Sequence, residues 1–210
     1  MNGQILPEKT YLESQTSVGK YTVTAENMVI AKLQVIPGNG FTKIQRNRSV
    51  EFTNVTNDIV VNITLAEPTT NANYYMGEMS FQYCKSMAVF TNDGWKMLDN
   101  YTWRHKTGSV THEVGENTYT VANGDILLVN DSNQVYVYTI KLDEKGAGFD
   151  WAHMEFLLDG KAVVGRDEIN VVVQPGKKAT VTAKMVGDTK KLDMKDQPLG
   201  KIKVEMQPTE

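Results

Sequence analysis

Residues 50–65 read VEFTNVTNDIVVNITL, two apolar runs around a polar centre. The runs, 50–52 and 59–65, are rich in Val, Ile and Thr, whose β-branched side chains fit a pleated strand better than a helix. The centre carries Asn and Asp, which tolerate the left-handed backbone of a tight turn. This stretch therefore predicts a β-hairpin.

Similar stretches return at residues 126–142, ILLVNDSNQVYVYTIKL, and at residues 169–185, INVVVQPGKKATVTAKM. Each again places turn residues between two β-branched runs, so each predicts another hairpin. Asp-Gly or Asn-Gly pairs between apolar runs predict further hairpins at 88–98, 117–129 and 154–164.

Short strands separated by turns, without a long amphipathic helix, are typical of β-sandwiches. The recurrence predicts an all-β protein with two tandem immunoglobulin-like β-sandwich domains and little or no helix, although a short helical turn begun by Asp150 is a local alternative. We expect an N-terminal arm over residues 1–17, one sandwich over 18–107 and a second over 108–210. The Cys–Trp–Cys core of antibody domains is absent, so we expect the wider immunoglobulin-like class, with one large sandwich as the alternative.

The composition favours folding inside a cell and argues against two classes of partner. The 210 residues are enough to bury a core without disulfides, and the single cysteine, Cys84, can form no disulfide framework. The net charge is −3 and the Lys and Arg residues are scattered, which argues against nucleic acid or an anionic membrane as partner. Neither a signal peptide nor an apolar run of roughly 18 residues is visible, so we expect neither export nor a membrane span.

Five Asn-X-Ser/Thr triplets have two interpretations. In a secreted eukaryotic protein each would be a candidate glycosylation acceptor. Because no signal peptide is visible, we interpret them instead as turn asparagines beside strand Ser and Thr. The triplets begin at Asn47, Asn54, Asn62, Asn100 and Asn130.

No catalytic motif stands out, so we expect neither enzyme activity nor a cofactor. No Ser or Cys lies in a nucleophile motif, and no Gly-rich phosphate loop occurs. A carboxylate pair for glycoside hydrolysis stays open, since such pairs meet in space rather than in sequence. His105, His112 and Glu113 would converge on a metal only if 101–106 and 110–114 formed a hairpin, and their spacing fits no tight motif. We therefore expect no metal site.

The first candidate contact lies in residues 41–48, which alternate in the manner of a strand and carry Lys43, Arg46 and Arg48. Three basic residues in one strand are typical of a protected sheet edge. The functional alternative is that Arg46 and Arg48 form a docking face for an acidic partner. The N-terminal arm is a further candidate, because an arm can become ordered against a partner.

The second candidate contact is the strip of Tyr101, Trp103 and Arg104 in the sequence NYTWRHK. Tyr, Trp and Arg dominate the hot spots of protein interfaces, and an aromatic strip could equally stack on a sugar ring. The alternative is that Trp103 fills a sandwich core while its basic neighbours face water.

The stretches 50–65, 126–142 and 169–185, together with the single cysteine and the lack of an export signal, resemble auxiliary and head-decoration proteins of tailed bacteriophages, such as the crAss-like phages. The resemblance implies a structural virion protein that binds the outer capsid lattice and either stabilises the head or presents an adhesive surface. Its partners would be the major capsid protein or other virion proteins, and it would be made in the host cytoplasm. The resemblance transfers no functional residue.

Two alternative functions remain open at this point. The chain could be a bacterial surface adhesion or carbohydrate-binding module that binds a cell-surface glycan, or it could be a phage tail or fibre component. An export signal upstream in the gene would favour the first alternative. Trimers or hexamers in solution would favour the second.

Overall fold

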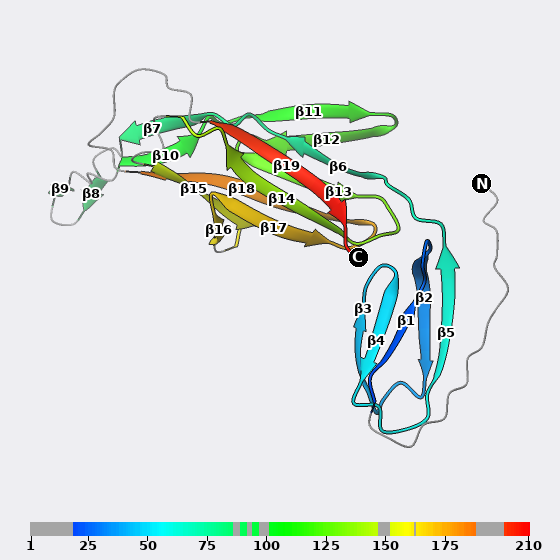
Figure 1. Ribbon diagram of the computed structural model, residues 1–210. Coiled ribbons are helices and arrows are strands. Elements are labelled where there is room, and N and C mark those ends of the chain that lie inside the picture. The colour runs from blue at the N-terminus through cyan, green and yellow to red at the C-terminus, as the bar shows by residue number, and fades with distance from the viewer. Residues whose placement is uncertain are drawn as a thin grey trace.

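The computed structural model describes residues 19–85, 89–91, 94–96, 101–146, 152–161, 163–187 and 200–210, and every regular element among them is a β-strand. The strands form several sheets around two hydrophobic clusters, which confirms the all-β prediction (Figure 1). We refer to residues 21–66 as the small sandwich and to residues 72–208 as the large sandwich.

The small sandwich packs a three-stranded sheet against a two-stranded one. Alternation along one strand brings Val50 and Phe52 to the same face, where they are buried with Ile30, and the Phe41 ring meets Phe52 edge-on at 5.4 Å. The first sheet has the order β1 (Tyr21–Thr24), β4 (Ser49–Thr53), β3 (Thr42–Gln45). The second sheet pairs β2 (Val29–Ile36) with β5 (Val60–Ala66).

The large sandwich packs a five-stranded sheet against a three-stranded one (Figure 1). Its core contains the fully buried Ile126, Tyr138 and Phe156, and the Tyr138 hydroxyl donates a hydrogen bond to Val129 O at 2.8 Å. The larger sheet has the order β16 (Val163–Arg166), β15 (Ala152–Leu158), β18 (Lys177–Gly187), β13 (Asp125–Asn130), β6 (Ala72–Met76). The smaller sheet has the order β17 (Glu168–Val173), β14 (Tyr136–Asp143), β19 (Lys201–Pro208).

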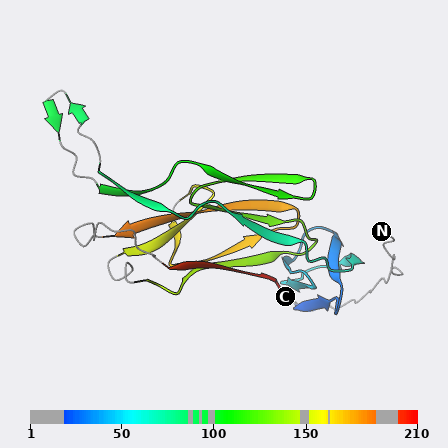
Figure 2. The same cartoon turned by 90° about the horizontal axis from the view of Figure 1, so that it is seen from above.

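Three two-stranded ribbons extend the large sandwich. One is the hairpin of β11 (Ser109–Val114) and β12 (Asn117–Ala122), which packs on β6, where Tyr119 stacks on Tyr75 with ring centres 4.5 Å apart. The other two pair β7 (Phe81–Lys85) with β10 (Tyr101–His105) and β8 (Val89–Thr91) with β9 (Gly94–Lys96). Figure 2 shows β8 and β9 at the opposite end of the molecule from the small sandwich.

The three recurring stretches are arches rather than hairpins, because the two strands of each belong to opposite sheets. In residues 50–65, β4 pairs with β1 and β3, whereas β5 pairs with β2. Residues 126–142 and 169–185 likewise cross between the two sheets of the large sandwich. The prediction of hairpins there is wrong, although Asn54 does adopt a left-handed backbone with φ of 55°. Apolar alternation suits two strands that face each other across a core as well as two strands that pair side by side.

Two of the three hairpins predicted from Asp-Gly and Asn-Gly pairs are confirmed. β8 pairs with β9, and β15 pairs with β16. The hairpin predicted at 117–129 is wrong, because β12 pairs with β11 while β13 pairs with β18 and β6. Residues 154–158 lie in β15 and not in a helical turn, and Asp150 lies outside the described residues.

The change from the small to the large sandwich falls in residues 67–71, between β5 and β6. β6 pairs with β13, and Ala72 lies in the core of the large sandwich. The boundary predicted between Thr107 and Gly108 therefore falls within the large sandwich. The repeat spacing misplaces it because two of the three arches belong to the same sandwich. The predicted arm, residues 1–17, lies outside the described residues.

Candidate interaction site

A buried asparagine, Asn47, bonds the two sandwiches to each other. It occupies a two-residue turn between β3 and β4, closed by a hydrogen bond from Arg46 N to Ser49 O at 2.8 Å. Its Nδ2 donates to Val135 O at 3.0 Å and to Thr209 O at 2.8 Å, and its Oδ1 accepts from Val135 N at 2.6 Å. Only 6% of Asn47 is exposed. Burial shields these three hydrogen bonds from water, which strengthens them.

A second set of polar contacts holds the linker, residues 67–71, against the turn between β13 and β14. Asn133 Oδ1 accepts from Thr69 N at 2.9 Å, and Asn133 Nδ2 donates to Glu67 O at 2.7 Å. Gln134 Nε2 donates to Thr69 O at 2.8 Å. Side chains of the large sandwich therefore fix the path of the linker.

Asn130 shapes that turn from within the protein. It is fully buried, and its Nδ2 donates to Gln134 O at 2.7 Å and to Val173 O at 2.8 Å. Its Oδ1 accepts from Ser132 N at 3.1 Å and from Ser132 Oγ at 2.6 Å. Since this buried amide is fully bonded, the turn has a defined shape. We use the term elbow for Asn47, the linker 67–71 and the turn 130–135.

Two hollows lie where the sandwiches meet. The first, of about 360 Å³, is lined by Arg46 of the small sandwich and Val172 of the large one. The second, of about 470 Å³, is lined by Arg48 and by the buried Gln134, whose Oε1 accepts no hydrogen bond from the described residues. The remaining lining residues are Gln45, Val135, Gln174, Thr209 and Glu210 in the first hollow, and Thr22, Thr24, Glu26, Ser49, Pro208, Thr209 and Glu210 in the second.

The predicted basic strand is partly a strand and partly the elbow turn. β3 is an edge strand of its sheet, as the sequence of residues 41–48 predicts, and it carries Lys43. Arg46 and Arg48 follow it on either side of Asn47, the first exposed and the second half-buried. Their role as contacts stays a prediction.

The second predicted contact lies far from the first. Tyr101, Trp103 and Arg104 belong to β10, which pairs with β7 at the end of the large sandwich farthest from the small one (Figure 1). The side chains of these three residues, and of Cys84 in β7, lie outside what the structure describes. Their contact role also stays a prediction. The structure places the two groups far apart, with Arg46 and Arg48 at the elbow and β10 at the other end of the large sandwich.

The hairpin that would have joined His105 to His112 does not form, because β10 pairs with β7 and β11 with β12. Each imidazole contacts a backbone carbonyl instead. His105 Nε2 meets Ala183 O, and His112 Nε2 lies 2.8 Å from Met76 O. Across the described ranges, no group of three His, Cys, Asp or Glu side chains could hold a metal ion.

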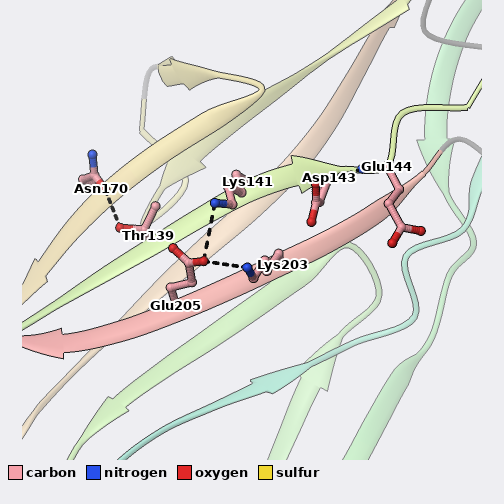
Figure 3. Close-up of polar contacts among 7 residues, drawn as sticks. All are labelled: Thr139, Lys141, Asp143, Glu144, Asn170, Lys203 and Glu205. Atoms are coloured by element: carbon pink, nitrogen blue, oxygen red, sulfur yellow. Dashed lines mark hydrogen bonds and ion pairs between the residues drawn. The ribbon is translucent and has the colours of Figure 1, made fainter.

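The outer face of the β17–β14–β19 sheet carries a further group of charges, and these are paired with one another (Figure 3). The Glu205 carboxylate lies 2.7 Å from Lys203 Nζ and 3.4 Å from Lys141 Nζ. The hydrogen bond between Glu205 and Lys203 lowers the pKa of the carboxyl group and raises the pKa of the amine. Lys201 pairs with Glu144 in the same region. Acids and bases therefore largely cancel on this face.

The elbow residues Asn47, Asn130 and Gln134 were missed by sequence reasoning as functional positions. A polar residue between turn and strand gives no signal that it will be buried. The triplets at Asn47 and Asn130 drew attention to both residues, but only as turn asparagines or, in a secreted protein, as candidate glycosylation acceptors. In the fold both amides are buried and hydrogen bonded, so neither can carry a glycan without disrupting the elbow.

Within the described part of the chain, no helix is long and apolar enough to cross a membrane. Comparison of the chain with protein-family models, curated proteins and solved structures finds no match.

Proposed function

We propose that the protein is a structural component of a bacteriophage virion, an auxiliary or decoration protein that binds the outer capsid lattice. The observation that carries the proposal is the elbow, in which Asn47 bonds Val135 and Thr209 and holds the two sandwiches as one bracket. A bracket with two ends can contact two neighbouring subunits, and weak contacts repeated over a lattice add by avidity. We also propose that the sandwiches belong to the immunoglobulin-like class that the sequence resembles.

In this proposal the protein acts by binding, without catalysis or a cofactor. Its partners are the major capsid protein or other virion proteins, and it is made in the host cytoplasm before it joins the virion. One contact would be made at the elbow through Arg46 and Arg48, and the other at the far end of the large sandwich through Tyr101, Trp103 and Arg104. Arg and aromatic side chains are favoured at both places because they dominate interface hot spots.

Immunogold electron microscopy of a phage-producing culture, with an antibody raised against this chain, tests the proposal. We expect label on phage heads. Label on the bacterial envelope would contradict the proposal and favour a surface module, which a glycan array would then examine. Label on tails would contradict capsid binding and favour a tail or fibre component.

A further inference from the structure

One edge of the small sandwich is open for pairing. All four residues of the edge strand β3 are exposed. The bond from Arg46 N to Ser49 O makes these two residues a hydrogen-bonded pair, and such pairs alternate with non-bonded pairs along an antiparallel ladder. Ile44 therefore directs its backbone groups toward β4, whereas Lys43 and Gln45 direct theirs outward. No described strand pairs with that outward side.

The charge along this edge is positive and uncompensated. Lys43, Arg46 and Arg48 form no ion pair with any described residue. Glu51 on the neighbouring strand β4 is paired with Lys20 at 2.8 Å and does not neutralise them. The lysines of β19 differ, because each has a carboxylate partner. The β3 edge is therefore a site of attraction for negative charge.

These charges decide which strands can pair with β3. A second copy of the chain would bring the basic side chains of two β3 strands together, and like charges across a strand pair are destabilising. A strand that carries carboxylates at alternate positions would gain attraction where the second copy meets repulsion. The residues that prevent self-association thus select an acidic strand.

The first hollow continues this edge into the large sandwich. It is lined by Gln45 at the end of β3, by Arg46, and by Val172 and Val135 of the large sandwich. Val172 is 58% exposed, which is high for a valine beside a hollow. A strand that pairs with β3 can place one apolar side chain there. Glu210 also lines the hollow and would repel a carboxylate there, which favours an apolar side chain beside Val172.

We propose that the open edge of β3 binds an extended acidic segment of a partner protein, which joins the β1–β4–β3 sheet as a further strand. Because side chains alternate along the strand, Lys43 lies on one face of the sheet and Ile44 on the other. Carboxylates of the segment lie beside Lys43, and its apolar side chains lie on the face of Ile44. This inference deepens the proposed function and rests on it only for the source of the segment, which would be a virion protein.

The test uses the full chain and a short, end-capped synthetic peptide that alternates Glu with Val. Hydrogen exchange followed by NMR reports on each backbone amide. In the free protein we expect fast exchange at Lys43 and Gln45, because their N–H groups face water. With the peptide present, we expect these two amides to become protected while those of β19 stay unchanged. Protection that omits Lys43 and Gln45, or no binding at all, would overturn the proposal.

A charge-reversed variant gives the second measurement. Lys43→Glu combined with Arg46→Glu should weaken peptide binding by about tenfold or more, since the two introduced carboxylates repel those of the peptide. The matched control is Lys32→Glu combined with Lys161→Glu, which changes the net charge equally at exposed positions away from β3. Equal binding by the two variants would overturn the proposal. If the first variant does not fold, the exchange pattern of the unaltered protein decides alone.

The two proposals fail separately. If the antibody labels phage heads but the peptide protects no amide of β3, the virion proposal stands and the β3 proposal is wrong. If the antibody labels no virion but the acidic peptide protects Lys43 and Gln45, the β3 proposal stands and the segment comes from a protein other than a virion protein. A peptide that alternates Lys with Val should not bind in either case, and binding by it would show that charge does not select the strand.

Discussion

The small and the large sandwich treat their surface charges differently. On the large one, cations lie beside acids, as Lys203 does with Glu205 at 2.7 Å and Lys145 with Asp167 at 2.6 Å. On the small one, Lys43 and its basic neighbours line an edge strand without an ion-pair partner among the described residues. Both have lysines on an edge strand, so the number of cations does not distinguish them. In our proposal, what would make the β3 edge able to bind a partner is that its charge is left unpaired.

The largest effect is expected at Asn47, because its side chain links the two sandwiches whose surfaces are compared above. Asn47→Ala removes three hydrogen bonds and leaves polar groups of Val135 and Thr209 without their partner. We expect the free energy of unfolding to fall by about 2–4 kcal/mol, measured by urea denaturation. Small-angle X-ray scattering should also show a wider range of shapes. The exposed Asn57→Ala is the control and should change stability by less than about 0.5 kcal/mol; equal losses would mean that Asn47 does not hold the elbow.

Tyr138 tests how the large sandwich satisfies polar groups in its core. Tyr138→Phe removes the hydrogen bond to Val129 O, and we expect a loss of about 1.5 kcal/mol at neutral pH. Burial raises the pKa of Tyr138 to about 12 from the usual 10.0. Between these values the unfolded chain loses the proton and the folded protein keeps it, so stability should fall as the pH rises. Tyr138→Phe should lack this part of the loss of stability at alkaline pH, measured by urea denaturation between pH 10 and about pH 12. The same loss in the variant would mean that Tyr138 does not cause it.

Asp167 tests the ion pairs of the large sandwich. Burial raises the pKa of Asp167. The hydrogen bonds from Lys145 and Met154 N, together with the Lys145 charge, lower it by more than burial raises it, so the pKa lies below 3.8. Its contribution is present above pH 3.8 and is lost as the pH falls through the folded pKa. Asp167→Asn should cost about 0.5–1 kcal/mol at neutral pH and reduce the acid loss, measured by thermal melts against pH. Asn tolerates the positive φ of 60° at this position, so the backbone is preserved. A variant with the same acid profile would contradict the pairing.

The smallest effect on stability is expected at Glu205, and this substitution tests most directly whether unpaired charge distinguishes β3 from β19. Glu205→Gln leaves Lys141 and Lys203 without their carboxylate and makes β19 resemble β3. Because these side chains are exposed, we expect no measurable change in the thermal melt. The Glu–Val peptide should now protect amides of β19 weakly, which it does not do in the unaltered protein. Failure to gain any binding would mean that unpaired charge alone does not make an edge receptive.

Much of the secondary structure could be predicted from sequence, whereas the pairing of strands could not. β-branched runs and turn residues located the strands of residues 50–65 correctly. Whether β4 and β5 pair with each other depends on how tightly the chain reverses, and both outcomes bury the same alternate side chains. The Asp-Gly turn predicted the hairpin of β15 and β16 correctly, whereas the same reasoning failed at Asn123-Gly124, where β12 and β13 pair with other strands.

The candidate site was predictable only in part. A basic edge at residues 41–48 follows from charge and alternation, and β3 does lie at an edge. The burial of Asn47 was not predictable, because its partners lie 88 and 162 residues away along the chain. The sequence around it contains nothing that specifies a distant carbonyl. The hollow lined by Arg46 and Val172 was not predictable either, because its lining residues also lie far apart along the chain.

That separation along the chain has a consequence for biosynthesis. A ribosome releases Asn47 well before Val135, and Thr209 later still, since they follow it by 88 and 162 residues. During translation the small sandwich emerges first, while the carbonyls that will hold it do not yet exist. In the nascent chain the small sandwich therefore lacks the hydrogen bond from Asn47 to Thr209 until β19 and Thr209 have been added. A partner that requires the fixed arrangement of the two sandwiches would therefore bind only chains in which β19 has been made.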